Sequence, residues 1–167
     1  MGMSVTISAA SAQDAEYILK LQYLCYQNEA ELYGDYTIEP LTQTLDDLRA
    51  ELDQGHGLVA RLGDEVVASV RGSADAAGLA RFAKLIVHPR LRRHGLGGRL
   101  LDAIEAHFAA EPAVQRFQLR AGHLNESNLR LYRNRGYVPV STEQLGPRLR
   151  LVTLEKAAAV GAYAASA

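Results

Sequence analysis

The sequence has a single cysteine, no strong excess of charge of either sign and no long apolar run. Cys25 is the only cysteine among 167 residues, so no disulfide can form within the chain. The formal net charge is −1, and acidic and basic residues are spread along most of the chain, so no broad field attracts nucleic acid or an anionic membrane. We therefore expect neither a nucleic acid nor a membrane as partner, and a small molecule as ligand.

No segment has the pattern of a secretory signal or a membrane span. The N-terminus lacks a basic region followed by a long apolar one, and no uninterrupted apolar run approaches the ~20 residues that cross a bilayer. Cys25 stands in an apolar helical stretch, where a buried thiol is expected rather than a nucleophile, and a reducing cytoplasm fits best. The length suits one hydrophobic core, so we expect a single domain at 4–156 and an alanine-rich tail at 157–167.

Hydrophobic periodicity predicts alternating strands and helices. Ser11 with Asp14, and Thr44 with Asp47, match capping boxes, which predict helices that end near residues 26 and 52 with an acidic, tyrosine-containing loop between them. The remaining elements are predicted as strands at 5–8, 58–62, 66–70, 79–88, 114–121, 137–142 and 148–155, and helices at 96–110 and 127–135. The segment 79–121 then forms a βαβ unit with a parallel strand pair.

A basic, glycine-rich turn joins the strand at 79–88 to the helix that follows it. Glycines let the backbone approach a ligand, and the free N–H groups of a helix N-terminus favour a pyrophosphate. An ordinary turn would also use glycines, but Arg92 and Arg93 beside them favour an anion site. A P-loop would need Lys and then Ser or Thr after Gly98, where Arg99 and Leu100 stand. A dinucleotide fingerprint would need a third small residue at position 100 and is the weaker alternative.

Two motifs resemble the GCN5-related N-acetyltransferase (GNAT) superfamily. Its signature, Arg/Gln-x-x-Gly-x-Gly/Ala after a strand ending in Val-x-Pro, is matched by residues 92–97 after Val87-His88-Pro89. Its second motif is an Asn followed seven residues later by Tyr and then by Gly-Phe or Gly-Tyr, which is matched by Asn125, Tyr132 and Gly136-Tyr137. The resemblance covers 81–138 well and the N-terminal half only in element order. It implies an α/β fold, a single domain with a mixed, twisted sheet of about six to seven strands and helices on both faces.

The resemblance further implies an enzyme that uses acetyl-CoA to acetylate a primary amine by direct attack, with no metal or redox cofactor. The backbone of Leu85, Ile86 and Val87 would pair with the pantetheine, and Asn125 would lie near it. Tyr132 would be the general acid that protonates the departing thiolate. A helix cap for Asn125 and a core aromatic for Tyr132 are the simpler interpretations. The pyrophosphate would be bound by the turn residues Arg92, Arg93, His94, Gly95, Leu96, Gly97 and Gly98.

The general base is not determined by the motifs. Arg120 stands where some members of the family carry a glutamate, and a guanidinium cannot act as a base. His123, Glu29 and Glu31 are the candidates, and a surface histidine without a role also explains His123.

The acceptor amine is inferred from charge. Glu29 and Tyr33 belong to an acidic stretch that suits an organic cation, although a solvated loop explains the stretch equally well. Arg71 and Arg120 would pair with a carboxylate. These residues suggest an acceptor with an amine and an anionic group, such as an amino acid. A CoA-binding regulatory module without turnover and a peptide or protein N-acetyltransferase are the alternatives, and whether the chain forms a homodimer stays open.

Overall fold

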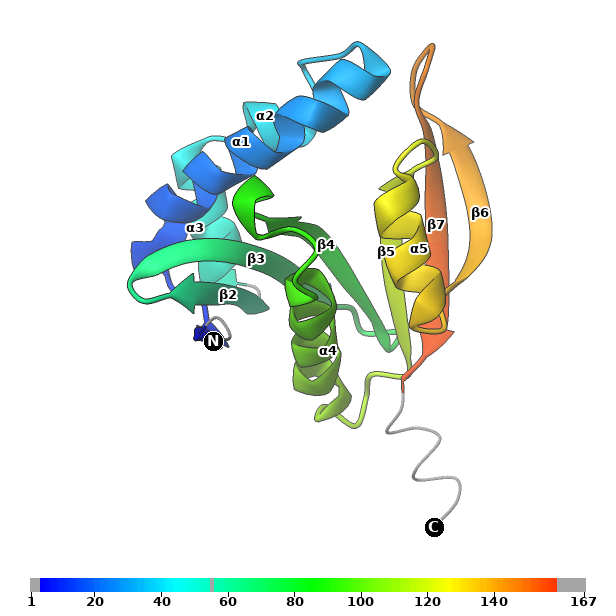
Figure 1. Cartoon of the computed structure of the whole chain (residues 1–167). Coiled ribbons are helices and arrows are strands. Elements are labelled where there is room, and N and C mark those ends of the chain that lie inside the picture. Colours follow the sequence, from blue (N-terminus) through cyan, green and yellow to red (C-terminus); the bar gives the residue numbers. More distant parts are fainter. Residues whose placement is uncertain (1–3, 55, 159–167) are drawn as a thin grey trace. The chain divides into compact units, whose positions relative to one another are not determined.

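A computed structural model describes residues 4–54 and 56–158 of the chain (Figure 1). These residues form a mixed seven-stranded sheet with the order β1-β2-β3-β4-β5-β7-β6, flanked by helices, as the sequence predicts. The strands are β1 (Val5–Ala9), β2 (His56–Leu62), β3 (Glu65–Ala74), β4 (Leu79–Val87), β5 (Arg116–Gly122), β6 (Val138–Gln144) and β7 (Arg150–Ala157). The helices are α1 (Ala15–Tyr33), α2 (Glu39–Thr42), α3 (Leu45–Gln54), α4 (Leu96–Ala109) and α5 (Glu126–Asn134), with 3-10 turns η1 (Ala12–Asp14) and η2 (Pro89–Leu91).

The chain divides into two compact units, and the division passes through β4 and α4. The first unit comprises the residues up to Gly72 together with Lys84–Ile104. The second comprises Ser73–Ala83 and the residues from Glu105 onward. Each unit is described separately below.

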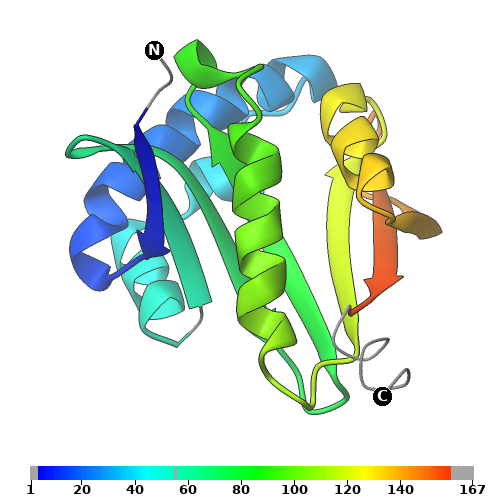
Figure 2. The ribbon, with the colours of Figure 1, turned by 60° about the horizontal axis from the view of Figure 1, so that its bottom comes forward.

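In the first unit, helices cover both faces of the strands. β1 pairs antiparallel with β2, and β2 pairs antiparallel with β3. Figure 2 shows the N-terminal part of α4 on one face of these strands and α1 on the other. The core on the α1 side joins side chains from α1, α3 and the strands, namely Ala15, Ile18, Leu21, Cys25, Leu48, Leu52, Val59, Val66 and Ile86.

Both predicted helix starts are confirmed by capping hydrogen bonds. The backbone N–H of Ser11 donates to Asp14 Oδ2 over 2.9 Å. The backbone N–H of Asp47 donates to Thr44 Oγ1 over 3.1 Å and opens α3. These bonds satisfy donors that a helix start otherwise leaves without an acceptor.

The predicted end of the first helix is wrong. The sequence predicts an end near residue 26, whereas α1 continues to Tyr33 and ends at Gly34, which takes the left-handed conformation at φ 65°. Between these points the chain has no glycine or proline that would stop a helix, and Gly34 is the first. Glu29 and Glu31 therefore lie on the last turns of α1 and not in a loop. α1 has 19 residues, and neither it nor any other helix in the described ranges has both the length and the apolar character needed to cross a bilayer.

The second unit is built on β5, β7 and β6, in which β7 pairs antiparallel with both β5 and β6. Leu79–Arg81 of β4 pairs parallel with Arg116–Gln118 of β5, which confirms the predicted βαβ unit. Phe82 packs in the core of this unit, with its ring centroid 5.6 Å from that of Phe108 and 5.1 Å from that of Phe117.

The expected alanine-rich tail begins within packed structure. Ala157 is the last residue of β7, and Ala158 is 1% exposed and donates its backbone N–H to Gln115 O over 2.9 Å. The rest of the tail, from residue 159, lies outside the described residues.

Candidate active site

The turn between β4 and α4 has the strand-turn-helix form that the sequence predicts. η2 follows the end of β4, and His88 caps it, since His88 Nδ1 accepts a hydrogen bond from the backbone N–H of Arg90 over 3.1 Å. α4 begins at Leu96, whose side chain is 2% exposed. This buried leucine fixes the start of the helix in the core, so the N–H groups of its first turn have a fixed direction.

Two residues of the turn have a left-handed backbone. Gly95 has φ 73° and Arg93 has φ 70°. Glycine takes this conformation without a steric penalty, whereas for arginine it is strained. No atom lies within 4 Å of the point that a Cβ on Gly95 would occupy. The backbone of the turn at Gly95 is therefore open to close approach by a ligand.

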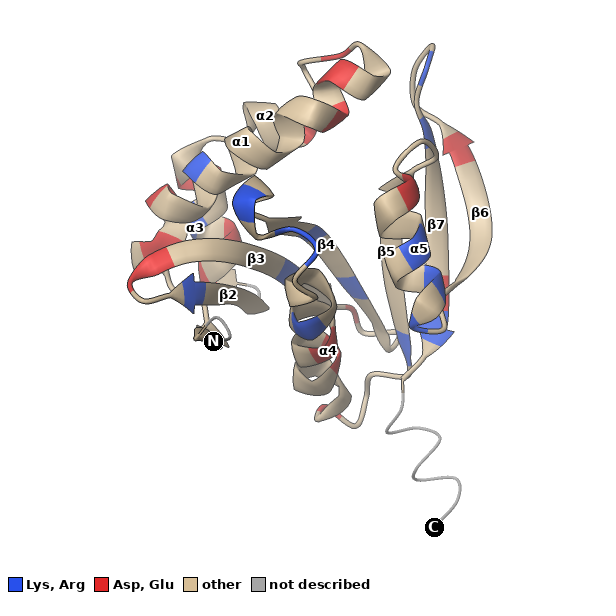
Figure 3. Cartoon of the chain, viewed as in Figure 1, with Lys and Arg blue, Asp and Glu red and all other residues tan. Residues whose placement is uncertain are grey.

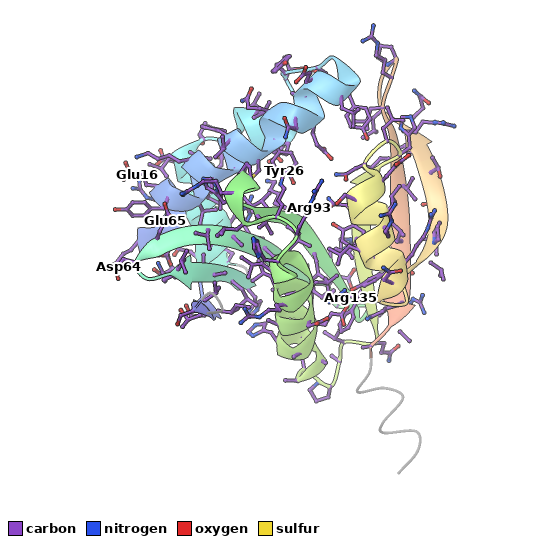
Figure 4. The ribbon with its side chains drawn as sticks, viewed as in Figure 1. Glu16, Tyr26, Asp64, Glu65, Arg93 and Arg135 are labelled. Carbon is purple, nitrogen blue, oxygen red and sulfur yellow. The ribbon has the colours of Figure 1, made fainter. Side chains whose placement is uncertain are left out.

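The charge around this turn is positive. Arg92 and Arg93 are exposed, and Figure 3 shows basic residues along the segment between β4 and α4. Arg93 projects from this segment (Figure 4). Backbone N–H groups at a helix start and two guanidinium groups form a donor set that suits phosphate oxygens. The residues of the turn thus fit the pyrophosphate of CoA.

Cys25 lies beside the end of β4. Its thiol donates to the carbonyl oxygen of Val87, with Sγ and O 3.4 Å apart. Burial raises the pKa of the Cys25 thiol to about 11, although the nearby Arg92 and the contact with Val87 offset part of this effect. Cys25 is therefore a buried, protonated thiol, as predicted, and not an activated nucleophile.

Lys84 interrupts β4 immediately before the segment Leu85–Val87. Its φ is 55°, a left-handed value inside an otherwise extended strand. Its side chain is 11% exposed, and Nζ lies 2.8 Å from Glu39 Oε1 and 3.9 Å from Glu51 Oε2. Nζ also donates to Gln43 Oε1 over 3.2 Å. Lys84 thus combines a strained backbone with ion pairs to two carboxylates. Backbone strain of this kind is common at functional sites.

Arg71, a predicted acceptor-binding residue, belongs to the same group of side chains. It is 3% exposed on β3, and its Nε donates to Glu51 Oε1 over 2.9 Å. Its Nη2 donates to Gln22 Oε1 over 2.7 Å and to Gln43 Oε1 over 3.2 Å. Its Nη1 is buried with no hydrogen-bond partner among the described residues. We call Gln22, Gln43, Glu51, Arg71 and Lys84 the polar cluster.

The polar cluster keeps Glu51 ionised. Burial raises the pKa of Glu51, but the charge of Arg71, the hydrogen bond from Gln43 and the charge of Lys84 outweigh burial and hold this pKa below its ordinary value. Gln43 Nε2 donates to Glu51 Oε2 over 2.6 Å. Arg71 is therefore bound within a buried network and not presented to solvent.

The remaining predicted acceptor residues of the first unit lie at the end of α1. Tyr33 is 4% exposed, and Glu29 is half-buried. Because Tyr33 is buried, its ring does not offer an open face to a cation, whereas Tyr36 in the following loop is 58% exposed.

In the second unit, Asn125 and Tyr132 both belong to α5. Asn125 is the N-cap, and its Oδ1 accepts from the backbone N–H of Asn128 over 3.1 Å. Tyr132 is 3% exposed, and its ring lies edge-on to that of Tyr137 with centroids 6.1 Å apart. Tyr137 OH donates to Glu105 Oε2 over 2.8 Å, which anchors this aromatic pair. The structure thus shows the cap and the packed aromatic that the simpler interpretations expect.

His123 and Arg120 lie on or beside β5. His123 Nδ1 is 3.0 Å from the backbone nitrogen of Arg150 and 3.2 Å from its carbonyl oxygen, so it accepts from the nitrogen or donates to the oxygen according to its tautomer. Arg120 is exposed, opposite Thr153 of β7. Within the described part of the chain its guanidinium has no hydrogen bond or ion pair. Arg120 is thus available to an anion, whereas Arg71 is not.

The sequence analysis does not single out Lys84, Glu51, Gln22 and Gln43. Two local signals point to them: Gln22 lies on the apolar face of a helix, and Lys84 interrupts an apolar strand. Polar side chains at such positions need partners in the interior. Over residues 4–54 and 56–158, no group of three or more His, Cys, Asp and Glu side chains is placed to hold a metal ion.

Comparison with known proteins identifies the family. The family model described as the acetyltransferase (GNAT) family matches residues 17–137, which is more than half of the chain. The chain therefore belongs to the GNAT family and is an N-acetyltransferase. Enzymes of this family generally use acetyl-CoA as the donor. A search of curated proteins found no match.

Solved structures agree with this assignment at the level of the fold. A GNAT-family acetyltransferase from Streptococcus pneumoniae has a TM-score of 0.73 at 19% identity, and the match covers 92% of this chain and 99% of that chain. The ribosomal-protein-S18-alanine N-acetyltransferase from Escherichia coli has a TM-score of 0.76 at 14% identity, with coverage of 93% and 94%. Ard1 from Thermoplasma volcanium has a TM-score of 0.72 at 22% identity, with coverage of 92% and 97%.

Proposed function

We propose that this protein transfers an acetyl group from acetyl-CoA directly to the primary amine of a small molecule, such as an amino-acid-like metabolite. The assignment of acetyl-CoA as the donor rests on the turn from Arg92 to Gly98. This turn has an open left-handed glycine and two arginines just before α4. Acetyl-CoA supplies an activated thioester, and the protein supplies binding, orientation and proton transfer.

Leu85–Val87 would orient the donor through backbone amides. The parallel register between β4 and β5 consists of three residue pairs and ends at Arg81 with Gln118. An extended segment beyond such a register can pair with the amides of a ligand as a sheet edge does. His94, Leu96 and Gly97 complete the turn that would hold the pyrophosphate.

Tyr132 would act as the general acid, donating its phenolic proton to the sulfur of the leaving thiolate. Its place in the second motif and the extent of the family match to residue 137 support this role. His123 is the first candidate for the general base, with Glu29 and Glu31 as the alternatives. If its Nδ1 donates to the carbonyl oxygen of Arg150, 3.2 Å away, Nε2 has a lone pair that can accept a proton from the amine.

The chemical class of the acceptor amine separates this proposal from its alternatives. The exposed, unpaired guanidinium of Arg120 supports an acceptor with an anionic group. The S18-alanine enzyme from Escherichia coli, which shares the fold, makes a peptide N-terminus the second candidate acceptor.

The test is thiol release from acetyl-CoA with free amino acids, their decarboxylated amines, polyamines and peptides with free N-termini. Fastest turnover with a small amine supports the proposal, and fastest turnover with a peptide supports the second candidate. CoA binding without turnover on any amine would contradict both and indicate a regulatory module.

A further inference from the structure

The ion pair between Lys84 and Glu39 joins two side chains of very different burial. The Lys84 side chain is 11% exposed, and the Glu39 side chain is 63% exposed. Glu39 is the first residue of α2, a helix of only four residues. An exposed carboxylate loses little when it exchanges its partner for water, whereas a buried ammonium group depends on its partners. Glu39 can therefore leave Lys84 at low cost.

The charge behind Lys84 is balanced only while a carboxylate occupies the position of Glu39. Arg71 and Lys84 are both cations, and Glu51 is the only carboxylate of the polar cluster. Glu51 is also much nearer to Arg71, at 2.9 Å, than to Lys84, at 3.9 Å. In addition, Nη1 of Arg71 has no acceptor among the residues that the structure describes. Without Glu39, the ammonium group of Lys84 would lack a close counter-charge.

The position of Lys84 in the chain connects the polar cluster to the donor segment. Lys84 directly precedes Leu85–Val87, which the proposed function assigns to the pantetheine. Its left-handed backbone is strained, and such strain persists where the surrounding structure requires a particular placement. The polar cluster fixes the lysine Nζ from α3 and from the segment between α2 and α3, through Glu51 and Gln43.

We propose that Lys84 binds the carboxylate of the acceptor amine, and that Glu39 occupies this position when no acceptor is bound. This inference rests on the proposed function and names the class of its substrate: primary amines that carry a carboxylate. The incoming carboxylate replaces one charge-assisted hydrogen bond by another, from Lys84 Nζ. An amine without an anionic group leaves Glu39 in place and gains nothing from Lys84.

The test compares free amino acids with the amines they give on decarboxylation. In Glu39→Gln, KM for the carboxylated member of each pair should fall roughly 2- to 5-fold, because an exposed competing ion pair is removed. In Lys84→Met, the same KM should rise at least about tenfold, because a charge-assisted hydrogen bond is lost. KM for the decarboxylated amines should change little in both variants. Asp46→Asn, which removes an exposed carboxylate 3.8 Å from Arg49 on α3, is the matched control and should leave every KM unchanged.

A binding measurement without turnover gives a second readout. Calorimetry with the same amino acids, in the absence of acetyl-CoA, should show tighter binding to Glu39→Gln than to wild type, and the weakest binding to Lys84→Met. Lys84→Arg keeps the charge and should keep the preference for a carboxylate, so a preference lost in Lys84→Met but kept in Lys84→Arg is not a folding effect.

The outcomes separate this inference from the proposed function. Acetylation of amines with no preference for a carboxylate, in wild type and in Glu39→Gln, overturns the inference and leaves the proposed function standing. A preference that survives in Lys84→Met and disappears in Arg120→Ala also overturns it and makes Arg120 the receptor. If wild type acetylates no amine, both fail.

Discussion

Replacing Gly95 by alanine separates the stability of the turn from its ligand binding. Gly95 has φ 73°, and a Cβ there would meet no atom within 4 Å. The cost to folding is therefore backbone strain alone, about 1–2 kcal/mol for a left-handed residue with a Cβ. For a protein of this size that corresponds to a fall in Tm of about 2–8 °C.

Gly63 and Gly78 provide matched variants. Gly63, in the turn between β2 and β3, has φ 63° and equally open surroundings, so Gly63→Ala should lose the same stability as Gly95→Ala. Gly78 has φ 89°, and a Cβ there would lie 2.7 Å from Ala113 O, so Gly78→Ala should lose more than either. Thermal unfolding measures this order.

The order of the glycine variants in CoA affinity should differ from their order in stability. Only Gly95→Ala places a methyl group where a pyrophosphate would approach the backbone, so calorimetry should show CoA binding weakened roughly tenfold in this variant and unchanged in Gly63→Ala. Equal CoA affinity in the two folded variants would refute the assignment of this turn to the pyrophosphate.

Four further substitutions test the site and the fold. Tyr132→Phe should keep CoA affinity and lose roughly 10²-fold or more in turnover, and an unchanged turnover number where chemistry limits the rate would exclude the general-acid role. Gly97→Asp should weaken CoA strongly, because it brings a side chain and a negative charge to the start of α4, while Arg93→Ala should be milder; calorimetry showing the reverse order would contradict this. Asp14 is 2.7 Å from Arg61. Burial raises the pKa of Asp14, but its bonds from Ser11 and Arg61 hold it below its ordinary value of 3.8. Its stabilisation is thus complete above that value and lost as pH falls through the lower folded pKa, so the destabilisation by Asp14→Asn in urea should shrink towards pH 3, and a constant difference would argue against ionic stabilisation.

The parts of the fold that were predicted correctly depend on local sequence. A cap needs residues three apart, and the strand-turn-helix form around residues 92–98 needs a strand, a few glycines and a helix within a short stretch, so each can be recognised locally. The end of α1 differs from the prediction although its signal is local. Acidic residues after position 26 are typical of a solvated loop, but no glycine or proline stops the helix before Gly34.

The polar cluster is not predictable in this way. Gln22 and Arg71 are 49 positions apart, and Lys84 and Glu39 are 45 apart, so their contacts form only in the folded chain. Gln22 on an apolar helix face and Lys84 in an apolar strand each indicate a polar group in the interior, but neither position shows which residue is its partner. The sequence predicts that Arg71 pairs with a carboxylate, but only the structure shows that its partners are Glu51, Gln22 and Gln43.

The burial of Cys25 gives the protein a built-in probe of its own motions. With a thiol pKa of about 11, only ~10⁻⁴ of the population carries a thiolate at neutral pH, and the sulfur is also shielded by the core. A thiol reagent can therefore modify the chain only when α1 and the end of β4 separate. Because no other cysteine competes, the rate of labelling reports the opening of this single contact without any engineered residue. Ligands that order the end of β4 should slow the labelling in proportion to their occupancy.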